Sequence, residues 1–241
     1  MYSIIKCYLR HILAVCVVSL CVMTGTAALS VKLDVDWPQF MSKQDMVWET
    51  LPEYWYESAY MGNGMLGLMI YKEPGQNYIR FETGNCSVHD HKAGSDLFAI
   101  PRLLTGHFAL HPEGTIVNGT MHLDLWNAEV STDITTTKGV IHLRSFVHAD
   151  EMMIIVKATT EGNEHDFQWE WIAAEANSPR YLIFKRQGKA NKIPKDYELN
   201  PTAKISNEKE VNLSVQKLLA GGETTVGWQE TKTSPQERIL W

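Results

Sequence analysis

The chain has 241 residues, of which 44% are hydrophobic and 21% are charged, so it is long enough to bury one substantial core. Its formal net charge is −6. A basic surface for nucleic acid is therefore absent from the composition, and we predict no nucleic-acid partner.

Residues 1–28 have the pattern of a secretory signal peptide. Lys6 and Arg10 precede an apolar run at residues 12–23, and small residues follow that run. The run is shorter than the roughly 20 residues that a helix needs to cross a bilayer. We therefore predict an exported protein, secreted or periplasmic, with no membrane span.

The cysteines define the alternative to a cleaved signal. A lipid anchor on Cys21 is the less favoured alternative, because Leu20 stands where lipobox sequences resemble one another in having Gly or Ala. Cys86 is the single cysteine of the predicted mature domain, residues 29–241, so we expect no internal disulfide.

The segments 60–71 and 79–85 are the centre of the sequence pattern. Gly62, Gly64 and Gly67 surround Asn63 and lead into an apolar run, which is typical of a tight turn that begins a strand. Their spacing also fits a dinucleotide-binding loop, but that motif requires a helix after the glycines. We therefore predict a turn and a β-hairpin formed by these two segments.

The middle of the chain predicts further strands. The segments 121–125 and 141–148 alternate apolar and polar residues with period two, and residues 137–139 have hairpin-turn chemistry. We also expect the strand at 107–110 to pair with the following strand across a turn at 112–114.

The last third continues this pattern after an interruption. Strands are predicted at 152–158, 167–171 and 211–216, whereas residues 177–210 are polar and read as a solvated excursion between strands. No segment of the mature chain shows sustained helical periodicity. The predicted fold is an all-β antiparallel sandwich of two packed sheets.

Several residues could carry chemistry. Glycoside hydrolysis requires two carboxylates at the scissile bond, and the candidates, none of which the sequence distinguishes, are Glu82, Asp90, Asp124, Glu129 and Glu170. The segment His89-Asp90-His91 could begin a metal site, and either histidine could activate Cys86 as a nucleophile. Because no third metal ligand lies nearby, we predict neither a metal nor a cofactor.

Three tryptophans have two possible uses. Trp126, Trp169 and Trp171 could stack on sugar rings, because an aromatic plane suits the C–H face of a pyranose. Filling the core between two sheets is the commoner use of such rings. The sequence alone leaves both readings open.

These segments together resemble the amino-terminal domain of glycoside hydrolase family 95, the α-L-fucosidase-like proteins. Residues 61–69 are similar to the "GNGxLG" turn and strand of that family, and residues 79–85 to the strand that follows. The segments 123–130, 139–148 and 215–222 are similar to its later strands. The resemblance extends over most of the mature chain.

The resemblance implies a β-supersandwich that packs against a following (α/α)6 barrel, in which the family's catalytic groups lie. None of those groups can be assigned here, so we predict no catalytic residue, and we expect the domain to be incomplete at its C-terminal end. The loop Glu82-Thr83-Gly84-Asn85 differs from the asparagine-glutamate-aspartate run that is usual in the family. That difference indicates a divergent branch.

The resulting hypothesis is a non-catalytic domain of an exported glycoside hydrolase, in which Asn63, Glu82 and His89 contact a glycan substrate. The alternative is a stand-alone carbohydrate-binding module with Trp169 and Trp171 as its platform. A binding module must expose those rings, whereas a support domain buries them and exposes another apolar face. A third hypothesis is a complete small hydrolase that uses Glu82 with Glu170 or Asp124.

Overall fold

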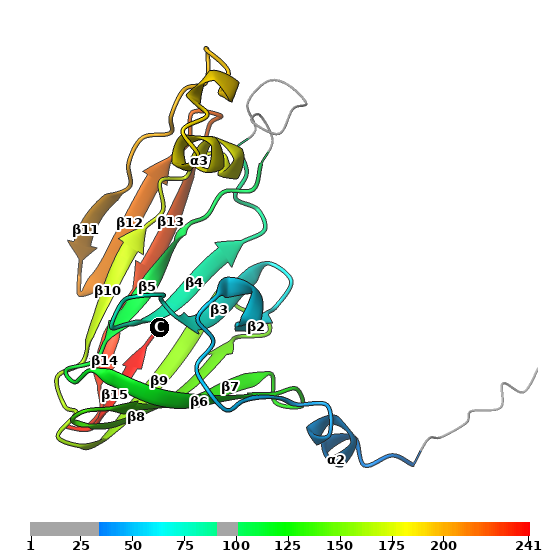
Figure 1. The fold of residues 1–241 in the computed structure, drawn as a ribbon, viewed down its shortest axis with the longest axis vertical. Helices are drawn as coiled ribbons and strands as arrows, with labels where there is room; N and C mark the ends of the chain where they lie inside the picture. The colour runs from blue at the N-terminus through cyan, green and yellow to red at the C-terminus, as the bar shows by residue number, and fades with distance from the viewer. Residues whose placement is uncertain (1–33, 91–100) are drawn as a thin grey trace, which may run out of the picture. The chain divides into compact units, whose positions relative to one another are not determined.

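The computed structural model describes residues 34–90 and 101–241 (Figure 1). The chain divides into a unit of Met1–Asp36 and a larger unit of Trp37–Trp241. The sheets and the candidate site all belong to the larger unit.

Three of the sequence predictions lie outside the described residues. These are the signal peptide at residues 1–28, the alternative lipid anchor at Cys21, and His91 of the histidine pair. Among the residues that the structure describes, no helix combines the length and the apolar character that crossing a bilayer requires.

The larger unit is all-β and antiparallel, as predicted. One sheet of seven strands consists, in order across it, of β1 (Met46–Trp48), β6 (Ile116–Asp124), β7 (Glu129–Thr136), β8 (Gly139–Val147), β9 (Ile154–Gly162), β15 (Glu237–Leu240) and β14 (Glu230–Lys232). The second sheet consists of β10 (Gln168–Ala173), β5 (Gly106–His111), β4 (Ile79–Asn85), β3 (Leu66–Lys72) and β2 (Ala59–Gly62). A third sheet, which the sequence did not predict, consists of β11 (Lys204–Glu208), β12 (Val211–Lys217) and β13 (Glu223–Trp228).

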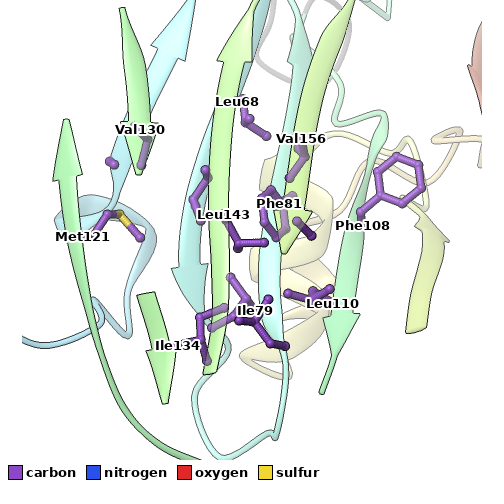
Figure 2. Close-up of a cluster of buried hydrophobic side chains, with 14 of the residues drawn as sticks. Leu68, Ile79, Phe81, Phe108, Leu110, Met121, Val130, Ile134, Leu143 and Val156 are labelled. Atoms are coloured by element: carbon purple, nitrogen blue, oxygen red, sulfur yellow. The ribbon is translucent and has the colours of Figure 1, made fainter. Parts of the chain in front are cut away.

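The core lies between the seven-stranded and five-stranded sheets. Figure 2 shows Ile134 and Leu143 of the first sheet meeting Ile79 and Phe81 of the second, and all four side chains are almost fully buried. Each such side chain stabilises the fold by about 1.5–3 kcal/mol relative to its exposed state. Because Cys86 is a free cysteine, this packing acts without help from a disulfide in the described chain.

The glycine-rich segment forms the predicted turn and hairpin. β2 pairs with β3 across a turn at which Gly64 has a φ of 91°, a conformation that L side chains rarely adopt. β3 then pairs with β4, in a register that runs from Leu66 opposite Asn85 to Lys72 opposite Ile79. The two hairpins make β2, β3 and β4 consecutive neighbours in the five-stranded sheet.

The predicted partner of the strand at 107–110 is wrong. β5 does not pair with β6 across residues 112–114 but lies between β4 and β10. The intervening turn instead carries the chain from one sheet to the other, where the buried Glu164 carboxylate accepts hydrogen bonds from the backbone N–H groups of Glu113 and Gly114. A non-local partner therefore replaces the local one, because the crossover places β6 in the opposite layer.

The helical segments are short. They are α2 (Trp37–Ser42), α3 (Pro179–Arg186) and the 3₁₀ turns η1 (Trp55–Glu57) and η2 (Ala190–Lys192). The prediction that residues 177–210 form only a polar excursion is thus incomplete, since α3, η2 and β11 lie within it. α3 begins with a proline at its first turn and buries none of its residues, so it lacks the apolar stripe that reveals a helix in a sequence.

Candidate functional site

Asn63 is held in the β2–β3 turn by four side-chain hydrogen bonds. Its Oδ1 accepts from the backbone N–H groups of Met65 (3.0 Å) and Leu66 (2.8 Å). Its Nδ2 donates to the carbonyls of His148 (2.9 Å) and Glu151 (3.0 Å) in the connection between β8 and β9. These bonds use the full capacity of the amide, and they tie the glycine turn to the opposite sheet.

His89 lies beyond the end of β4, where it forms an isolated β-bridge with Arg102. Glu82, by contrast, lies within β4. The structure therefore places these two predicted residues in different segments, and Asn63 in a third. Across residues 34–90 and 101–241, no group of three or more His, Cys, Asp or Glu side chains is arranged to hold a metal ion.

Glu82 belongs to a polar cluster on the face of the five-stranded sheet that points away from the core. We call this the outer-face cluster and define it as Tyr71, Tyr78, Arg80, Glu82 and His107. The alternation of side chains along β4 explains why the cluster lies on this face. Ile79 and Phe81 face the core, so Arg80 and Glu82 face outward. The register places Arg80 opposite Tyr71 and Glu82 opposite His107.

Arg80 is the hydrogen-bond donor at the centre of this cluster. Its Nε donates to Glu82 Oε2 at 2.5 Å, and its Nη1 donates to Glu73 Oε2 at 3.1 Å. The guanidinium carbon lies 5.9 Å from the centre of the Tyr71 ring. One cation thus orients two carboxylates and one aromatic ring.

Tyr78 places its ring beside two histidines of β5. The ring centres are 6.4 Å apart for Tyr78 and His107, with nearly parallel planes, and 5.1 Å apart for Tyr78 and His111. Ala109 is the β5 residue between the two histidines on this face and carries only a methyl group.

Burial sets the electrostatics of the cluster. Burial raises the pKa of Glu82, and the nearby Arg80 charge opposes that rise without cancelling it. Burial, assisted by Arg80, lowers the pKa of His107 to about 4, so its imidazole is neutral at pH 7. Burial also raises the pKa of Tyr71 to about 12.

Two polar atoms of the cluster are buried without a hydrogen-bond partner among the described residues. They are Oε1 of Glu82 and Nε2 of His107. Both residues are only 7% exposed and face each other across β4 and β5. Because leaving such atoms unpaired costs about 1–3 kcal/mol each, a pair of them at one position in a sheet marks a candidate binding site.

The remaining carboxylate candidates have structural partners. Glu170 lies on β10 and contacts His111 Nε2 at 3.0 Å, while Asp124 accepts two hydrogen bonds from Asn127 in the β6–β7 turn. Glu129 forms a two-bond ion pair with Arg144 on β8. Asp124 and Glu129 belong to the seven-stranded sheet, so the fold does not assemble them with Glu82.

Trp169 and Trp171 are packed on the inner face of β10. Their ring centres lie 5.1 Å from Phe81 and 4.8 Å from Phe108, respectively, and both tryptophans contact the main core cluster. They therefore do not form a free aromatic platform. Trp126, in the β6–β7 turn, is half exposed.

The sequence reasoning did not identify an aromatic surface at η1 and β2. Tyr54, Trp55, Tyr56 and Tyr60 are all exposed, with 68% of Tyr60 accessible, and the Tyr54 and Tyr56 rings stack with their centres 5.3 Å apart. We call these four residues the aromatic surface. Their clustering around the turn-rich segment before the glycines was the available signal.

An apolar cavity of about 290 Å³ lies between the sheets near the C-terminal residue. Its lining includes Leu68, Phe108 and Trp228 together with the hydroxyl-bearing Thr83 and Thr105. Both hydroxyls already bond within the protein, since Thr83 donates to the Gly106 carbonyl and Thr105 to the Thr83 carbonyl. The cavity can thus accept an apolar group but offers no reactive side chain.

Comparison with known proteins does not assign a family. No protein-family model matches the sequence, and no curated protein is significantly similar to it. The resemblance to glycoside hydrolase family 95 therefore stays a prediction from the residues. The features of the molecule that bear on function are the fold, the outer-face cluster and the aromatic surface.

Proposed function

We propose that this chain is the amino-terminal, non-catalytic β-sandwich domain of an exported α-L-fucosidase-like glycoside hydrolase that acts on glycans. In this role it supports a catalytic (α/α)6 barrel. The observation that carries the proposal is the arrangement of residues 61–85. The segments that carry the resemblance form the consecutive strands β2, β3 and β4, with the Asn63 turn fixed by four hydrogen bonds.

The distribution of aromatic residues favours a support domain over a binding module built on β10. Trp169 and Trp171 pack against the core, whereas the aromatic surface at η1 and β2 is accessible. Exposed aromatic side chains that contact one another, as Tyr54, Trp55 and Tyr56 do, are characteristic of a surface that contacts another domain or protein. The barrel is the occupant that this proposal requires.

The test begins with the DNA that follows codon 241. We expect a reading frame that continues into a long helical region, and we expect the two segments, expressed together, to co-purify and to hydrolyse 4-nitrophenyl glycosides. This chain alone should be inactive. Absence of any encoded helical region, or hydrolysis by this chain alone, would contradict the proposal.

A pair of variants tests the contact surface in the same assay. Trp55→Ala removes an exposed ring of the aromatic surface and should weaken co-purification with the helical segment. Trp126→Ala removes a half-exposed ring on the other sheet and should leave co-purification unchanged. Equal behaviour of the two variants would show that the aromatic surface is not the contact.

A further inference from the structure

The outer-face cluster has the features of a site for a ligand hydroxyl group. Glu82 and His107 occupy facing positions on β4 and β5, where directly opposed Cβ atoms lie about 4.5–5.5 Å apart. One oxygen of Glu82 is fixed by Arg80, while the other oxygen and His107 Nε2 are the two unpaired buried atoms of this cluster. A single polar atom located between these groups can bond to both.

The charges around the pair exclude most other ligand groups. Glu73 and Glu82 pair with the guanidinium of Arg80, and Glu170 lies on the same face two strands away, so an anion such as phosphate would be repelled. A metal cation would need more ligands than the pair supplies, and no such group exists in the described residues. A neutral hydroxyl group fits, because it can donate its one proton to the carboxylate oxygen of Glu82 and accept a hydrogen bond from the Nε2–H tautomer of the neutral His107 imidazole.

We propose that Glu82 and His107 bind one hydroxyl group of a neutral pyranose on the outer face of the five-stranded sheet, with Arg80 as the positioning residue that orients Glu82. The hydroxyl is inferred from the cluster itself, while the choice of a sugar rests on the proposed function. The role of Glu82 in glycan contact is thereby extended to a partner, His107, that the sequence did not identify.

Tyr78 is the side chain that must respond to such a ligand. Its ring lies against His107, and both unpaired atoms are covered in the structure. Binding therefore requires the groups that cover these atoms to move, and Tyr78, whose ring lies beside His107, is one side chain that can move; its ring can then face the apolar side of the sugar. Tyr78 lies in the β3–β4 turn directly before β4, where its carbonyl accepts a hydrogen bond from the Glu73 N–H and its side chain also interacts with His111 and Arg80.

The experiment uses the full chain and NMR detection of the His107 ring. Methyl α-L-fucopyranoside, methyl β-D-galactopyranoside and methyl β-D-xylopyranoside are titrated separately up to about 50 mM, a range that detects millimolar affinity. We expect at least one of them to shift the His107 ring resonances in a saturable way. His107→Phe, which keeps a ring beside Tyr78 but removes Nε2, should weaken binding about tenfold, as expected for a lost hydrogen bond.

His142→Phe is the matched control, because His142 lies on β8 in the other sheet and pairs with the exposed Asp133. It should bind the same sugar as the unmodified chain does. Glu82→Gln, which keeps the shape but removes the charge, should also weaken binding. The inference is overturned if no sugar gives a saturable shift, or if folded His107→Phe binds as tightly as the unmodified chain.

Failure of the hydroxyl site and failure of the proposed support role give different experimental results. If the sugars do not bind but the chain still supports hydrolysis by a downstream barrel, only the hydroxyl site fails. If a sugar binds at His107 but no barrel is encoded, the support role fails and the binding site stands.

Discussion

At the scale of single residues, burial of His107 makes the stability of the fold sensitive to acid. Its pKa is about 4 in the folded protein, against 6.5 for the unperturbed side chain. A base with a lowered pKa binds a proton more readily in the unfolded state than in the folded state. The free energy of unfolding is therefore fully retained above pH 6.5 and decreases as the pH falls toward 4. The full decrease in the free energy of unfolding corresponds to about 3 kcal/mol.

The prediction is that His107→Phe removes this loss. Urea unfolding at pH 7 and at pH 4.5 should show the unmodified chain losing stability relative to the variant on acidification. The same comparison for His142→Phe, a substitution on β8 in the other sheet, is the control. An equal acid response in the unmodified chain and His107→Phe would mean that His107 is not the buried base.

Asn63 is the second residue at which a local change has a large expected effect. Asn63→Ala removes the four side-chain bonds that join the glycine turn to the β8–β9 connection, and it should lower the free energy of unfolding by about 2 kcal/mol. Asn163→Ala is the control, because Asn163 is exposed and its backbone supplies its hydrogen bond to Lys138. Chemical denaturation of both variants distinguishes the two cases.

At the scale of strands, two glycines of the five-stranded sheet should differ sharply. Gly106 begins β5 with a φ of 144°, and a Cβ there would lie 2.6 Å from the Trp171 ring and 2.7 Å from the Ile172 carbonyl oxygen. Gly84 on β4 has nothing within 4 Å of such a Cβ. Gly106→Ala should therefore destabilise the protein by about 2–3 kcal/mol, and Gly84→Ala by less than about 1 kcal/mol.

Thermal unfolding of the two variants measures this difference. The Gly106 substitution should also expose Trp171, because the ring must move to make room for the methyl group, and its fluorescence should shift to longer wavelength. A Gly106→Ala variant as stable as Gly84→Ala would contradict the close packing of β5 on β10.

The strands also show what the sequence could and could not reveal. Period-two alternation identified β6 and β8, and the glycines identified the β2–β3 turn, because these signals are local. β5 follows β4 after a connection of about twenty residues. Alternation within a strand does not show which strand lies beside it after a connection of that length. For that reason Glu82 was a candidate from sequence, whereas His107, which the register places opposite it, was not.

At the scale of the whole domain, the third sheet is joined to the sandwich through one tryptophan in particular. Trp228, at the end of β13, has its ring centre 5.6 Å from that of Phe108 and 5.8 Å from that of Trp171. β11, by contrast, is exposed along its whole length. The small sheet therefore depends on this aromatic contact more than on a core of its own.

Trp228→Ala should consequently loosen β11–β13 while the two larger sheets stay folded. We expect amide hydrogen exchange to accelerate in the three strands of the small sheet, and the global free energy of unfolding to fall by about 2–3 kcal/mol, less than for a fully buried tryptophan. Trp126→Ala, at the half-exposed β6–β7 turn, should change neither quantity appreciably. Faster exchange spread evenly over all three sheets would instead mean that the domain opens as one cooperative unit.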